Sequence, residues 1–457
     1  MNAAVEELRT TLGTDLVKVG EDIPQRNWHD QVGMTPTRPL ALVLPRSTED
    51  VSKALAICHR HRQPVVTQGG MTGLAGGAHP GEGEVALSLE RMVGIEEVDP
   101  ASNTLTALAG TPLYLVQQAA EDAGLMCGID LGARGSCSIG GNISTNAGGN
   151  QVLRYGMARK NVLGLEVVLA DGRVVRSLNK MMKNNAGYDW TQMFIGSEGT
   201  LGVVTRVVLG LHARPRGVQT AVLAVDGVED AIKVLRAAER GLPGGLLVFE
   251  AMWSEFYGIA ITTIGVPAPI PAGHDLYLLV EAPTGEAGPE LFEEFLAGLY
   301  EQGLVKDAVI AKSKAERDRL WMLRESVYEY AKHLPKSVGF DVSIPLGRMR
   351  EAIDALRRDM PRIVDGIVWV VFGHVADSNL HVNAMPPVDG AEIKLAIEKV
   401  VYDLTSSLGG SVSAEHGIGR AKKPYLGLSR TEPELALMAT IKGALDPAGI
   451  LNPGRVL

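Results

Sequence analysis

The stretch Gly135-Ser-Cys-Ser-Ile-Gly-Gly-Asn-Ile-Ser-Thr-Asn-Ala-Gly-Gly149 combines glycine with small neutral polar residues and carries no charged side chain. Glycine lets the main chain approach a ligand closely and turn its N–H groups inward, and Ser, Thr and Asn add neutral hydrogen bonds. Residues 68–77 and 196–202 form two further clusters of this kind, the second with one acid, Glu198. Together these segments suit the pyrophosphate of a dinucleotide.

Each cluster taken alone is equally well explained as a surface turn, because glycine is common in loops. Three clusters within one region favour a binding role over three unrelated turns. Neither a G-x-G-x-x-G nor a G-x-x-x-x-G-K-[ST] spacing occurs in the chain, so the sequence supports neither a Rossmann domain nor a P-loop. The phosphates would have to be held by another fold.

The size and composition of the chain are those of a multidomain globular protein. Its 457 residues predict two or three domains, and 46% of them are hydrophobic and 21% charged. The formal net charge of −9 argues against a nucleic-acid partner or an anionic membrane, since both require a basic surface. There is no signal-peptide pattern and no apolar run of the roughly 20 residues that span a bilayer, so a soluble cytoplasmic protein is expected. The three cysteines lack C-x-x-C spacing, which indicates free thiols.

The N-terminal region reads as the start of an α+β domain. Residues 39–45 and 64–67 have the apolar, β-branched character of short strands, and Ser47-Thr-Glu-Asp50 between them is a capping sequence for a helix. The second strand leads directly into the glycine cluster at 68–77.

A second region begins near Thr220, where strands and helices alternate. The pattern predicts strands at 222–225, 246–250, 276–281, 339–344 and 366–374, and helices at 229–240, 252–264, 289–301, 315–332 and 348–358. Strands that return between such helices indicate an antiparallel sheet covered on one side, as in ferredoxin-like folds. Pro215-Arg-Gly217 is the expected boundary, and the last ~45 residues, again rich in glycine, are expected to rejoin the first domain.

Four residues of the C-terminal half have the chemistry of a metal-assisted proton transfer. His374 and His381 flank the turn-prone string Ala-Asp-Ser-Asn, and Glu415 and His416 are adjacent. Imidazole nitrogen and carboxylate oxygen are the ligands of catalytic zinc, and manganese or cobalt uses the same set. A single strand histidine more often bonds a neighbouring carbonyl, so the interpretation depends on the four together.

A carboxylate substrate would need a cation, and Arg324 is the candidate. On the helix expected after Ala315, Arg324 shares a face with Trp321 and Tyr328, beside an apolar stripe, which puts it at the edge of the core. The alternative is an exposed ion pair with a neighbouring glutamate, Glu325 or Glu329.

Two polar residues near the histidines have less specific signals. Asn383 lies two residues beyond His381, so it faces the same side of a strand and could bond substrate. Asp377 is interpreted as a turn residue rather than as a partner that orients a histidine.

Five motifs in this order resemble the FAD-linked oxidases of the vanillyl-alcohol-oxidase and p-cresol-methylhydroxylase (PCMH) superfamily, in their D-2-hydroxyglutarate and D-lactate dehydrogenase branch. They are Pro45-Arg-Ser-Thr-Glu-Asp50, the stretch 130–149, Arg154-Tyr-Gly156, residues 196–204 and Asn452-Pro-Gly454, with the glycine turn at 68–77 between the first and the second. The resemblance implies an α+β protein with three parts. These are a PCMH-type FAD-binding domain at 1–216, a ferredoxin-like antiparallel-sheet cap domain for substrate at 217–410, and a short C-terminal helical segment at 411–457 that returns to the FAD domain.

The same resemblance assigns a set of residues to FAD: Gly69, Gly70, Met71, Thr72, Gly73, Leu74, Gly77, Gly135, Ser136, Gly140, Gly141, Asn142, Ser144, Thr145, Asn146, Gly148, Gly149, Tyr155, Gly156, Glu198, Gly202, Val204 and Asn452. Some family members attach the flavin through a histidine near the first glycine turn. No His or Cys stands beside Met71, and His79 falls past the turn, so non-covalent FAD is expected. Cys137 is interpreted as a packed thiol.

The roles implied for the polar residues form one reaction. His374, His381 and Glu415 ligate a divalent metal, expected to be zinc, while Arg324 grips the α-carboxylate, and Tyr328, Asn383 and His374 contact substrate. The metal lowers the pKa of the substrate hydroxyl, His416 removes its proton as base, and hydride passes from the α-carbon to flavin N5. The implied activity is the oxidation of a D-2-hydroxy acid to the 2-oxo acid.

The chain departs from the family pattern at two places. Ala376 and Ser378 replace the glycines of the usual Gly-Asp-Gly-Asn turn between the histidines. Gly339 and Tyr328 stand where hydroxyglutarate-type members are expected to have a lysine and a threonine, although Lys336 is near. A dicarboxylate is therefore disfavoured, and a bulkier or apolar 2-hydroxy acid becomes an alternative; which 2-hydroxy acid is used stays open.

Other functions within the same superfamily stay open at this point. One is a transferase like alkyl-dihydroxyacetone-phosphate synthase, which would need a basic phosphate cluster in the cap; another is an oxygen-using 2-hydroxy acid oxidase; a third is a non-enzymatic flavin or metal binder. The electron acceptor is open between an electron-transfer flavoprotein, a quinone, a cytochrome and oxygen. A homodimer is among the assembly states left open.

Overall fold

The computed structural model describes residues 2–285 and 288–457. By internal contacts the chain divides into two compact units. Unit 1 consists of Met1–Gly149, Tyr155–Arg214 and Glu415–Leu457, and unit 2 of Asn150–Arg154 and Pro215–Ala414. The main change from unit 1 to unit 2 thus falls beside Pro215, and unit 1 is assembled from three separate stretches of sequence. The functional labels of the domains stay predictions.

The N-terminal part of unit 1 contains a four-stranded sheet in the order β1-β2-β4-β3. Its elements are α1 (Ala3–Leu12), β1 (Val17–Lys18), β2 (Ala41–Val43), α2 (Thr48–Arg60), β3 (Val65–Gln68) and β4 (Val85–Ser88). Strands β2, β4 and β3 are parallel, and β1 is antiparallel to β2. The predicted strand, capped helix and strand are confirmed, and Ser47 and Asp50 form a capping box at the start of α2.

A five-stranded antiparallel sheet, β5-β6-β10-β8-β9, forms the rest of the framework of unit 1. Its strands are β5 (Ile95–Asp99), β6 (Thr104–Leu108), β8 (Val162–Val168), β9 (Val174–Ser177) and β10 (Val203–Gly210). Strands β7 (Leu125–Met126) and β11 (His212–Ala213) form a separate two-stranded antiparallel sheet. The helices here are α3 (Leu113–Asp122), α4 (Ile139–Ser144), α5 (Val152–Tyr155), α6 (Ala158–Asn161) and α7 (Thr191–Phe194). One apolar core joins both sheets, with Val43, Leu55, Leu105 and Val207 all nearly inaccessible to solvent.

The last part of the chain contributes to unit 1 through helix α15 (Glu432–Leu445) and the residues after it. Leu451 forms a parallel bridge with Val65, so the chain adds to the edge of β3. Arg455, whose side chain is 0% exposed, pairs with both oxygens of Glu84 at 2.7 Å. This buried pair fastens the C-terminal segment to the loop before β4.

Unit 2 is built on a seven-stranded sheet in the order β15-β12-β14-β13-β17-β18-β16. The strands are β12 (Val218–Val225), β13 (Val248–Trp253), β14 (Leu276–Pro283), β15 (Asp307–Ile310), β16 (Val338–Ser343), β17 (Val368–Gly373) and β18 (Asn379–Met385). All the pairings are antiparallel, as the sequence predicts. The helices are α8 (Val228–Gly241), α9 (Ser254–Thr262), α10 (Glu290–Glu301), α11 (Lys314–Glu325), α12 (Tyr330–His333), α13 (Met349–Asp359) and α14 (Ala391–Ser407).

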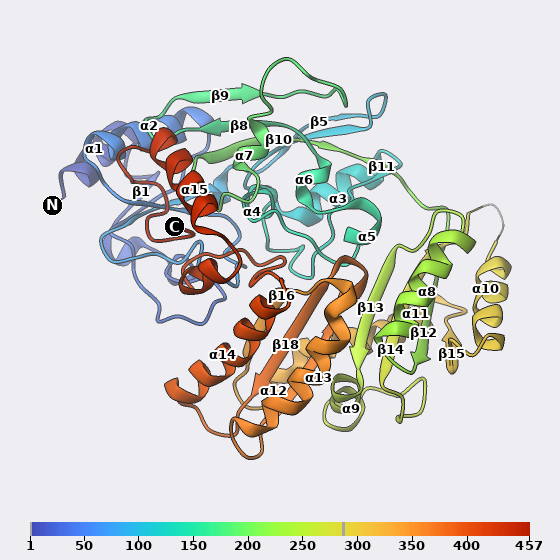
Figure 1. The fold of residues 1–457 in the computed structure, drawn as a ribbon. Coiled ribbons are helices and arrows are strands. Elements are labelled where there is room, and N and C mark those ends of the chain that lie inside the picture. Colours follow the sequence, from blue (N-terminus) through green and yellow to red (C-terminus); the bar gives the residue numbers. More distant parts are fainter. Residues whose placement is uncertain (1, 286–287) are drawn as a thin grey trace. The chain divides into compact units, whose positions relative to one another are not determined.

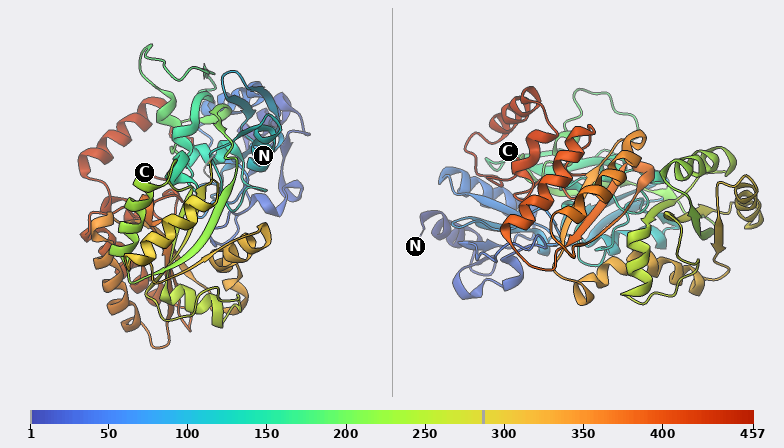
Figure 2. Two further views of the ribbon diagram at one scale, coloured as in Figure 1. Left: turned by 90° about the vertical axis from the view of Figure 1, so that its right-hand side faces the viewer. Right: turned by 60° about the horizontal axis from the view of Figure 1, so that its bottom comes forward.

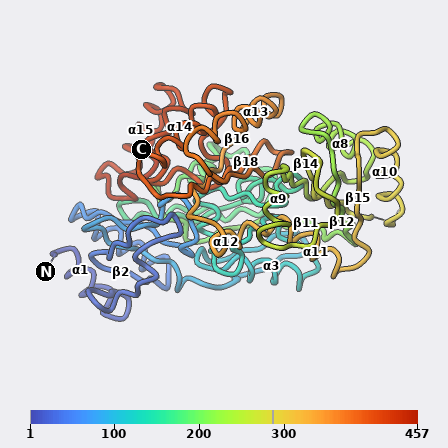
Figure 3. Tube along the Cα trace, turned by 90° about the horizontal axis from the view of Figure 1, so that it is seen from below, coloured from blue at the N-terminus to red at the C-terminus, as the bar shows by residue number. Residues whose placement is uncertain are grey.

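Helices cover both faces of this sheet, so the prediction of cover on one side is wrong. Every residue of β13 is buried, and a strand without alternation must be covered on both faces. On one face Phe256 of α9 contacts Phe372 of β17, with ring centroids 4.7 Å apart. On the other, Phe340 of β16 packs edge-on against Tyr402 of α14. Helices α13 and α14 run side by side (Figures 1 and 2), and Figure 3 shows them on the side of the strands opposite to α9.

Two predicted helices of unit 2 differ from the structure, and two of its elements were not predicted. The helix expected at 315–332 is broken: α11 ends at Glu325, a 3-10 turn covers Ser326–Glu329, and α12 is a separate short helix. The helix expected to start at Met252 starts at Ser254, because Met252 and Trp253 still belong to β13. Strand β15 and helix α14 were not expected.

Replacing Arg455 by Ala is expected to lower the free energy of unfolding by about 1–3 kcal/mol, because the buried Glu84 carboxylate loses two charge-assisted hydrogen bonds and keeps those from Arg420 and the Gly81 N–H. Arg430→Ala is the control, since the Arg430–Glu434 pair is half exposed and its loss should leave stability unchanged. Urea unfolding of both variants checks the difference. Equal stability of the two variants would contradict the proposed fastening role of Arg455.

Candidate active site

In unit 1 the first glycine turn lies directly against the second glycine-rich segment. A Cβ on Gly70 would stand 2.0 Å from the carbonyl oxygen of Ser136, and one on Gly69 would stand 2.5 Å from Ser138 Oγ. Real Cβ atoms do not approach other atoms so closely, so only glycine allows this contact of main chain with main chain. The turn after β3 and the segment leading into α4 therefore form one surface.

The third glycine cluster and Asn452 join the same surface. The Glu198 N–H donates at 2.8 Å to the carbonyl of Ser144, the last residue of α4. The Asn452 side chain donates to the Glu198 carbonyl at 2.7 Å and accepts from the Thr67 N–H at 2.8 Å. Segments that are far apart in sequence thus converge where the family resemblance assigns FAD.

Each of these segments contains a non-glycine residue in the left-handed backbone region. They are Met71 (φ +57°), Asn146 (φ +50°), Glu198 (φ +52°) and Asn452 (φ +45°). Such conformations cost free energy and concentrate at binding sites, where the surrounding structure fixes them. Their recurrence in all four motifs fits a surface shaped for a ligand rather than a set of ordinary turns.

The residues present fit a non-covalent FAD. Asn142 is 5% exposed, and its Oδ1 has no hydrogen-bond partner among the residues that the structure describes, so this acceptor suits a ligand donor. Burial raises the pKa of the Cys137 thiol, which keeps it protonated and unreactive, as expected of a packed thiol. All the residues that the sequence assigns to FAD belong to unit 1. For Gly202, one of these residues, packing alone explains the glycine, because a Cβ there would collide with Val167 and Phe194.

The Glu198 carboxylate has a role that the sequence did not reveal. It accepts the N–H groups of Ile418 and Gly419 at 2.7 and 2.8 Å, and so holds the turn that follows His416. Burial raises the pKa of Glu198, and these two hydrogen bonds only partly oppose that rise. Nearby, Glu415 Oε1 accepts the Gly149 N–H at 2.6 Å. The segment carrying Glu415 and His416 is thus tied at both ends to the FAD-assigned motifs of unit 1.

In unit 2 the register of the sheet lines up polar residues on one face. Met252 pairs with Phe372, Phe372 with His381, and His381 with Asp341. Residues directly across from each other share a face, and Glu250, two residues before Met252, shares it too. Helices α9 and α11 cover this face.

His374 and His381 converge on that face, as the sequence predicts. Their rings are perpendicular, with centroids 5.5 Å apart, and a nitrogen of each lies within 4.8 Å of one on the other. The two side chains are 5% and 9% exposed. His374 Nδ1 is hydrogen-bonded to the Glu250 carboxylate. Two imidazoles in this arrangement suit a divalent cation.

Arg324 is buried and is paired with Glu250, a residue that the sequence analysis did not single out. Its Nε donates to Glu250 Oε2 at 2.7 Å, and its guanidinium lies 4.6 Å from the centre of the Phe372 ring. Burial alone would raise the pKa of Glu250, but the neighbouring His374 and Arg324 outweigh it and lower that pKa to about 2. The alternative of an exposed ion pair for Arg324 is wrong.

Tyr328 does not share a face with Arg324. The helix ends at Glu325 and tightens into a 3-10 turn, which leaves Tyr328 66% exposed while Arg324 is 7% exposed. The predicted spacing of i and i+4 therefore fails at the change of helix type. Within unit 2, Tyr328 is not part of the cluster around Glu250.

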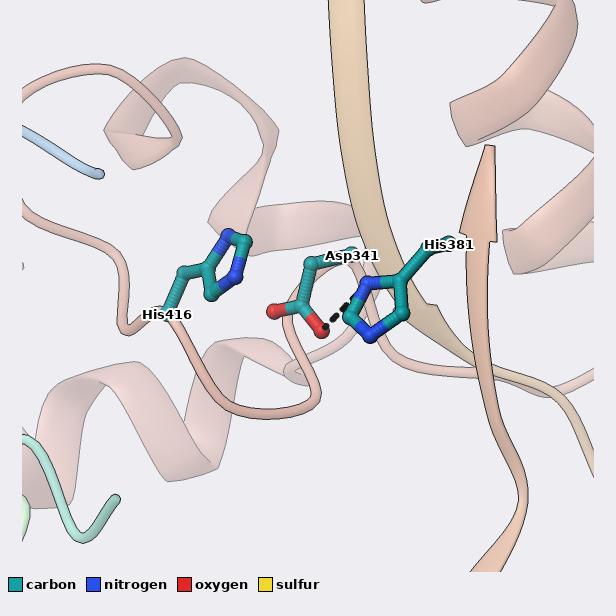
Figure 4. Close-up of side chains that lie close together, drawn as sticks. All are labelled: Asp341, His381 and His416. Atoms are coloured by element: carbon teal, nitrogen blue, oxygen red, sulfur yellow. Dashed lines mark ion pairs between the residues drawn. The ribbon is translucent and has the colours of Figure 1, made fainter. Parts of the chain in front are cut away.

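Asp341 is a second buried carboxylate that the sequence analysis missed. It accepts from the Asn379 side chain at 2.7 Å and from the Ala414 N–H at 3.1 Å. One oxygen lies 3.9 Å from His381 Nδ1, the ion pair drawn in Figure 4. Glu415 and His416 follow Ala414 directly in the chain and are assigned to unit 1. Asn383 lies on β18 opposite Gly339, on the same face as His381.

The turn between the histidines keeps its left-handed residue although the glycine is missing. Ser378 has φ +72°, whereas Ala376 lies in a 3-10 turn and is not among the residues with positive φ. Of the two residues that replace glycine in this turn, only Ser378 therefore strains the backbone.

Comparison with known proteins gives this arrangement a family. The family model described as "FAD linked oxidases, C-terminal domain" matches residues 214–456, and the one described as "FAD binding domain" matches residues 39–177. The chain belongs to the FAD-linked oxidase family. The C-terminal model begins at residue 214, beside the boundary between units 1 and 2 at Arg214 and Pro215.

Curated relatives match over almost the whole chain. A protein of Oryza sativa subsp. japonica named probable D-2-hydroxyglutarate dehydrogenase, mitochondrial, is 38% identical, with 99% of this chain and 81% of the relative aligned. The D-2-hydroxyglutarate dehydrogenase of Xanthomonas citri pv. viticola is 39% identical, with 100% and 96% aligned. The mitochondrial enzyme of Bos taurus is 39% identical, with 91% and 76% aligned. The chain is therefore an FAD-dependent dehydrogenase.

Solved structures show the same PCMH-type fold. A p-cresol methylhydroxylase with substrate bound has a TM-score of 0.79 and 18% identity, over 100% of this chain and 96% of its own. An alkyldihydroxyacetonephosphate synthase has a TM-score of 0.73 and 17% identity, over 98% and 84%. At this identity the likeness concerns the fold alone, and it includes enzymes of different chemistry.

Replacing Ser378 by Gly is expected to raise the free energy of unfolding by about 1 kcal/mol, because glycine adopts a positive φ without a Cβ clash. Ala376→Gly, two residues earlier, is expected to lower it by about 0.5–1 kcal/mol, since flexibility is gained there without relief of strain. Denaturant unfolding compares the two variants. A destabilised Ser378→Gly protein would contradict strain in this turn.

Proposed function

We propose that the protein oxidises a D-2-hydroxy acid to the 2-oxo acid, with FAD as oxidant and a divalent metal as assistant. One observation chiefly supports this: the side chains of His374, His381 and Arg324 meet around Glu250 and Phe372 in unit 2. A 2-hydroxy acid has its hydroxyl and its carboxylate on neighbouring carbons. Imidazoles could hold a metal for the hydroxyl, and a guanidinium close to them could bind the carboxylate. Membership of the FAD-linked oxidase family supports FAD as the cofactor.

Each residue has a defined part in the proposed reaction. His374, His381 and Glu415 hold the cation, which when bound lowers the pKa of the substrate hydroxyl. Arg324 binds the α-carboxylate, and Asn383 bonds substrate from the strand that carries His381. His416 takes the hydroxyl proton as base. FAD, when bound, accepts the hydride of the α-carbon at N5.

Glu415 and His416 are proposed for these roles from the family pattern. Their support in the structure is local: the turn after His416 is held by the Glu198 carboxylate, and Glu415 is held by Gly149. Zinc is the proposed metal because two imidazoles and a carboxylate match its preferred ligands, and manganese or cobalt would use the same set.

Two observations bear on the side chain of the substrate, and they favour different acids. The relatives reported above are named D-2-hydroxyglutarate dehydrogenases, which makes D-2-hydroxyglutarate the first acid to test. Against it, Gly339 on β16 offers no cation to a second carboxylate. Tyr328, which stands where a threonine is expected in hydroxyglutarate-type members, is exposed and lies outside the cluster around Glu250. Lys336, just before β16, is exposed as well and would be the nearest lysine in sequence. A substrate panel decides between a dicarboxylate and an apolar acid.

The rival functions share the fold and differ in what they require beyond it. A transferase of the alkyl-dihydroxyacetone-phosphate-synthase kind would need cations for a phosphate, whereas the buried cation Arg324 is already paired with a carboxylate. An oxygen-using oxidase would have the same substrate site and differs only in the electron acceptor. Electron-transfer flavoprotein or quinone is the proposed acceptor.

The location of the protein in the cell stays a prediction. None of the helices within residues 2–285 and 288–457 has the length and apolar content that crossing a membrane demands. The rice and cattle relatives are named mitochondrial, and the Xanthomonas relative is a bacterial protein.

Anaerobic addition of a substrate 2-hydroxy acid is expected to bleach the yellow protein, since two electrons pass to the flavin. The panel contains D- and L-2-hydroxyglutarate, D- and L-lactate, and bulkier apolar D-2-hydroxy acids, and absorbance near the flavin band reports the rate. Persistent colour with every acid would rule out this substrate class. Bleaching by apolar acids but not by D-2-hydroxyglutarate would assign the specificity to the missing lysine.

His416→Asn is expected to slow flavin reduction by about 10²–10⁴-fold, the usual contribution of a general base, while FAD content and metal content stay at the wild-type level. Stopped-flow absorbance and metal analysis measure these quantities. A wild-type rate in this variant would remove His416 from the mechanism.

Treatment of the protein with a chelator is expected to abolish flavin bleaching by the substrate, and re-addition of zinc is expected to restore it. Bleaching that survives chelation would remove the metal from the mechanism.

A further inference from the structure

We propose that Glu250 is the positioning residue of the active site: its one carboxylate fixes the metal-binding histidine and the carboxylate-binding arginine relative to each other. This inference rests on the proposed function, because it concerns the same site. Glu250 lies in the middle of β13, is 1% exposed, and its two oxygens have different partners. Oε1 pairs with His374 Nδ1, and Oε2 accepts from Arg324 Nε at 2.7 Å.

The contact with His374 decides which ring nitrogen faces a metal. A carboxylate can only accept a hydrogen bond, so His374 Nδ1 must carry the hydrogen in this pair. The lone pair of the neutral ring is then on Nε2, the nitrogen on the far side from Glu250. A carboxylate in this position fixes the tautomer and orientation of a metal-bound histidine and makes it a stronger ligand.

The contact with Arg324 decides which edge of the guanidinium faces a substrate. Glu250 occupies Nε, and the Phe372 ring lies 4.6 Å from the guanidinium carbon. The guanidinium is held on one edge and one face, which leaves the edge formed by Nη1 and Nη2 for a bidentate pair with a carboxylate. Because the same carboxylate holds His374, the spacing of the two groups is set by the width of one side chain.

A purely structural buried ion pair is the competing explanation, and the same sheet face contains a matched control. Glu281 on β14 is 4% exposed and is gripped by the same helix, α11. It accepts from Trp321 at 2.8 Å and from Arg317 Nε at 2.7 Å. It also accepts from Thr220 Oγ1 at 2.8 Å. These three partners include no histidine, so replacing Glu281 tests the loss of a buried carboxylate without removing a contact of His374.

The experiment compares Glu250→Gln, Glu281→Gln and Arg324→Lys with the wild-type protein. Zinc affinity is measured by competition with a chromogenic chelator in the absence of substrate, and KM by anaerobic flavin reduction. Glu250→Gln is expected to weaken zinc binding by about 10–100-fold and to raise KM by roughly tenfold, since both partners are released. Arg324→Lys is expected to raise KM by a similar factor with zinc affinity within about twofold of wild type. Glu281→Gln should change neither.

The outcomes separate this inference from the proposed function. If the wild-type protein neither binds zinc nor bleaches with any 2-hydroxy acid, the proposed function fails. If it does both and Glu250→Gln behaves like Glu281→Gln, the positioning role of Glu250 is overturned. Should Glu250→Gln fail to fold, Glu250→Asp takes its place, because it keeps the charge and shortens the reach by one methylene. Zinc affinity and KM both unchanged in Glu250→Asp would equally overturn the inference.

Discussion

The antiparallel register of the seven-stranded sheet is the constraint on which the polar site of unit 2 depends. Side chains alternate between faces along a strand, so a slip by one residue would move a whole row to the opposite face. The pairing of Met252, Phe372, His381 and Asp341 across four strands therefore settles at once which residues can meet. Glu250 belongs to the same row by its spacing from Met252. The main-chain hydrogen bonds between the strands thus determine which side chains of different strands meet at the site.

Burying the carboxylates of this row is expensive unless each one is fully paired. Glu250 is balanced by a histidine and an arginine, and Asp341 by an amide side chain and a main-chain N–H. Such networks are rigid, because moving one member leaves another unpaired in a medium of low dielectric constant. Rigidity is what a site for two charged groups of one small molecule requires. In unit 1 the analogous rigidity comes from main-chain contacts between glycine-rich segments, where no charge is needed.

Sequence reasoning found most of the elements but not the contacts that unite them. The family motifs, the capped helix α2 and the antiparallel sheet of unit 2 could be predicted because their signals are local. The partnership of Glu250 with His374 could not, since 124 residues separate them and either could have faced the other side of a strand. The break after Glu325 was missed because the periodicity of the side chains continues through it. The five-stranded sheet was overlooked although residues 162–177 contain two β-branched runs separated by an Asp-Gly turn, a recognisable hairpin signal.

The discontinuous composition of unit 1 has a consequence for biosynthesis. Residues 415–457 leave the ribosome only after the whole of unit 2 has emerged. The bridge between Val65 of β3 and Leu451, and the ion pair between Glu84 and Arg455, can therefore form only late in translation. Unit 2 comes almost entirely from one continuous stretch and can mature earlier on the nascent chain. Until then the open edge of β3 and the unpaired Glu84 carboxylate are exposed to solvent, and exposed strand edges of this kind are prone to wrong pairing before folding is complete.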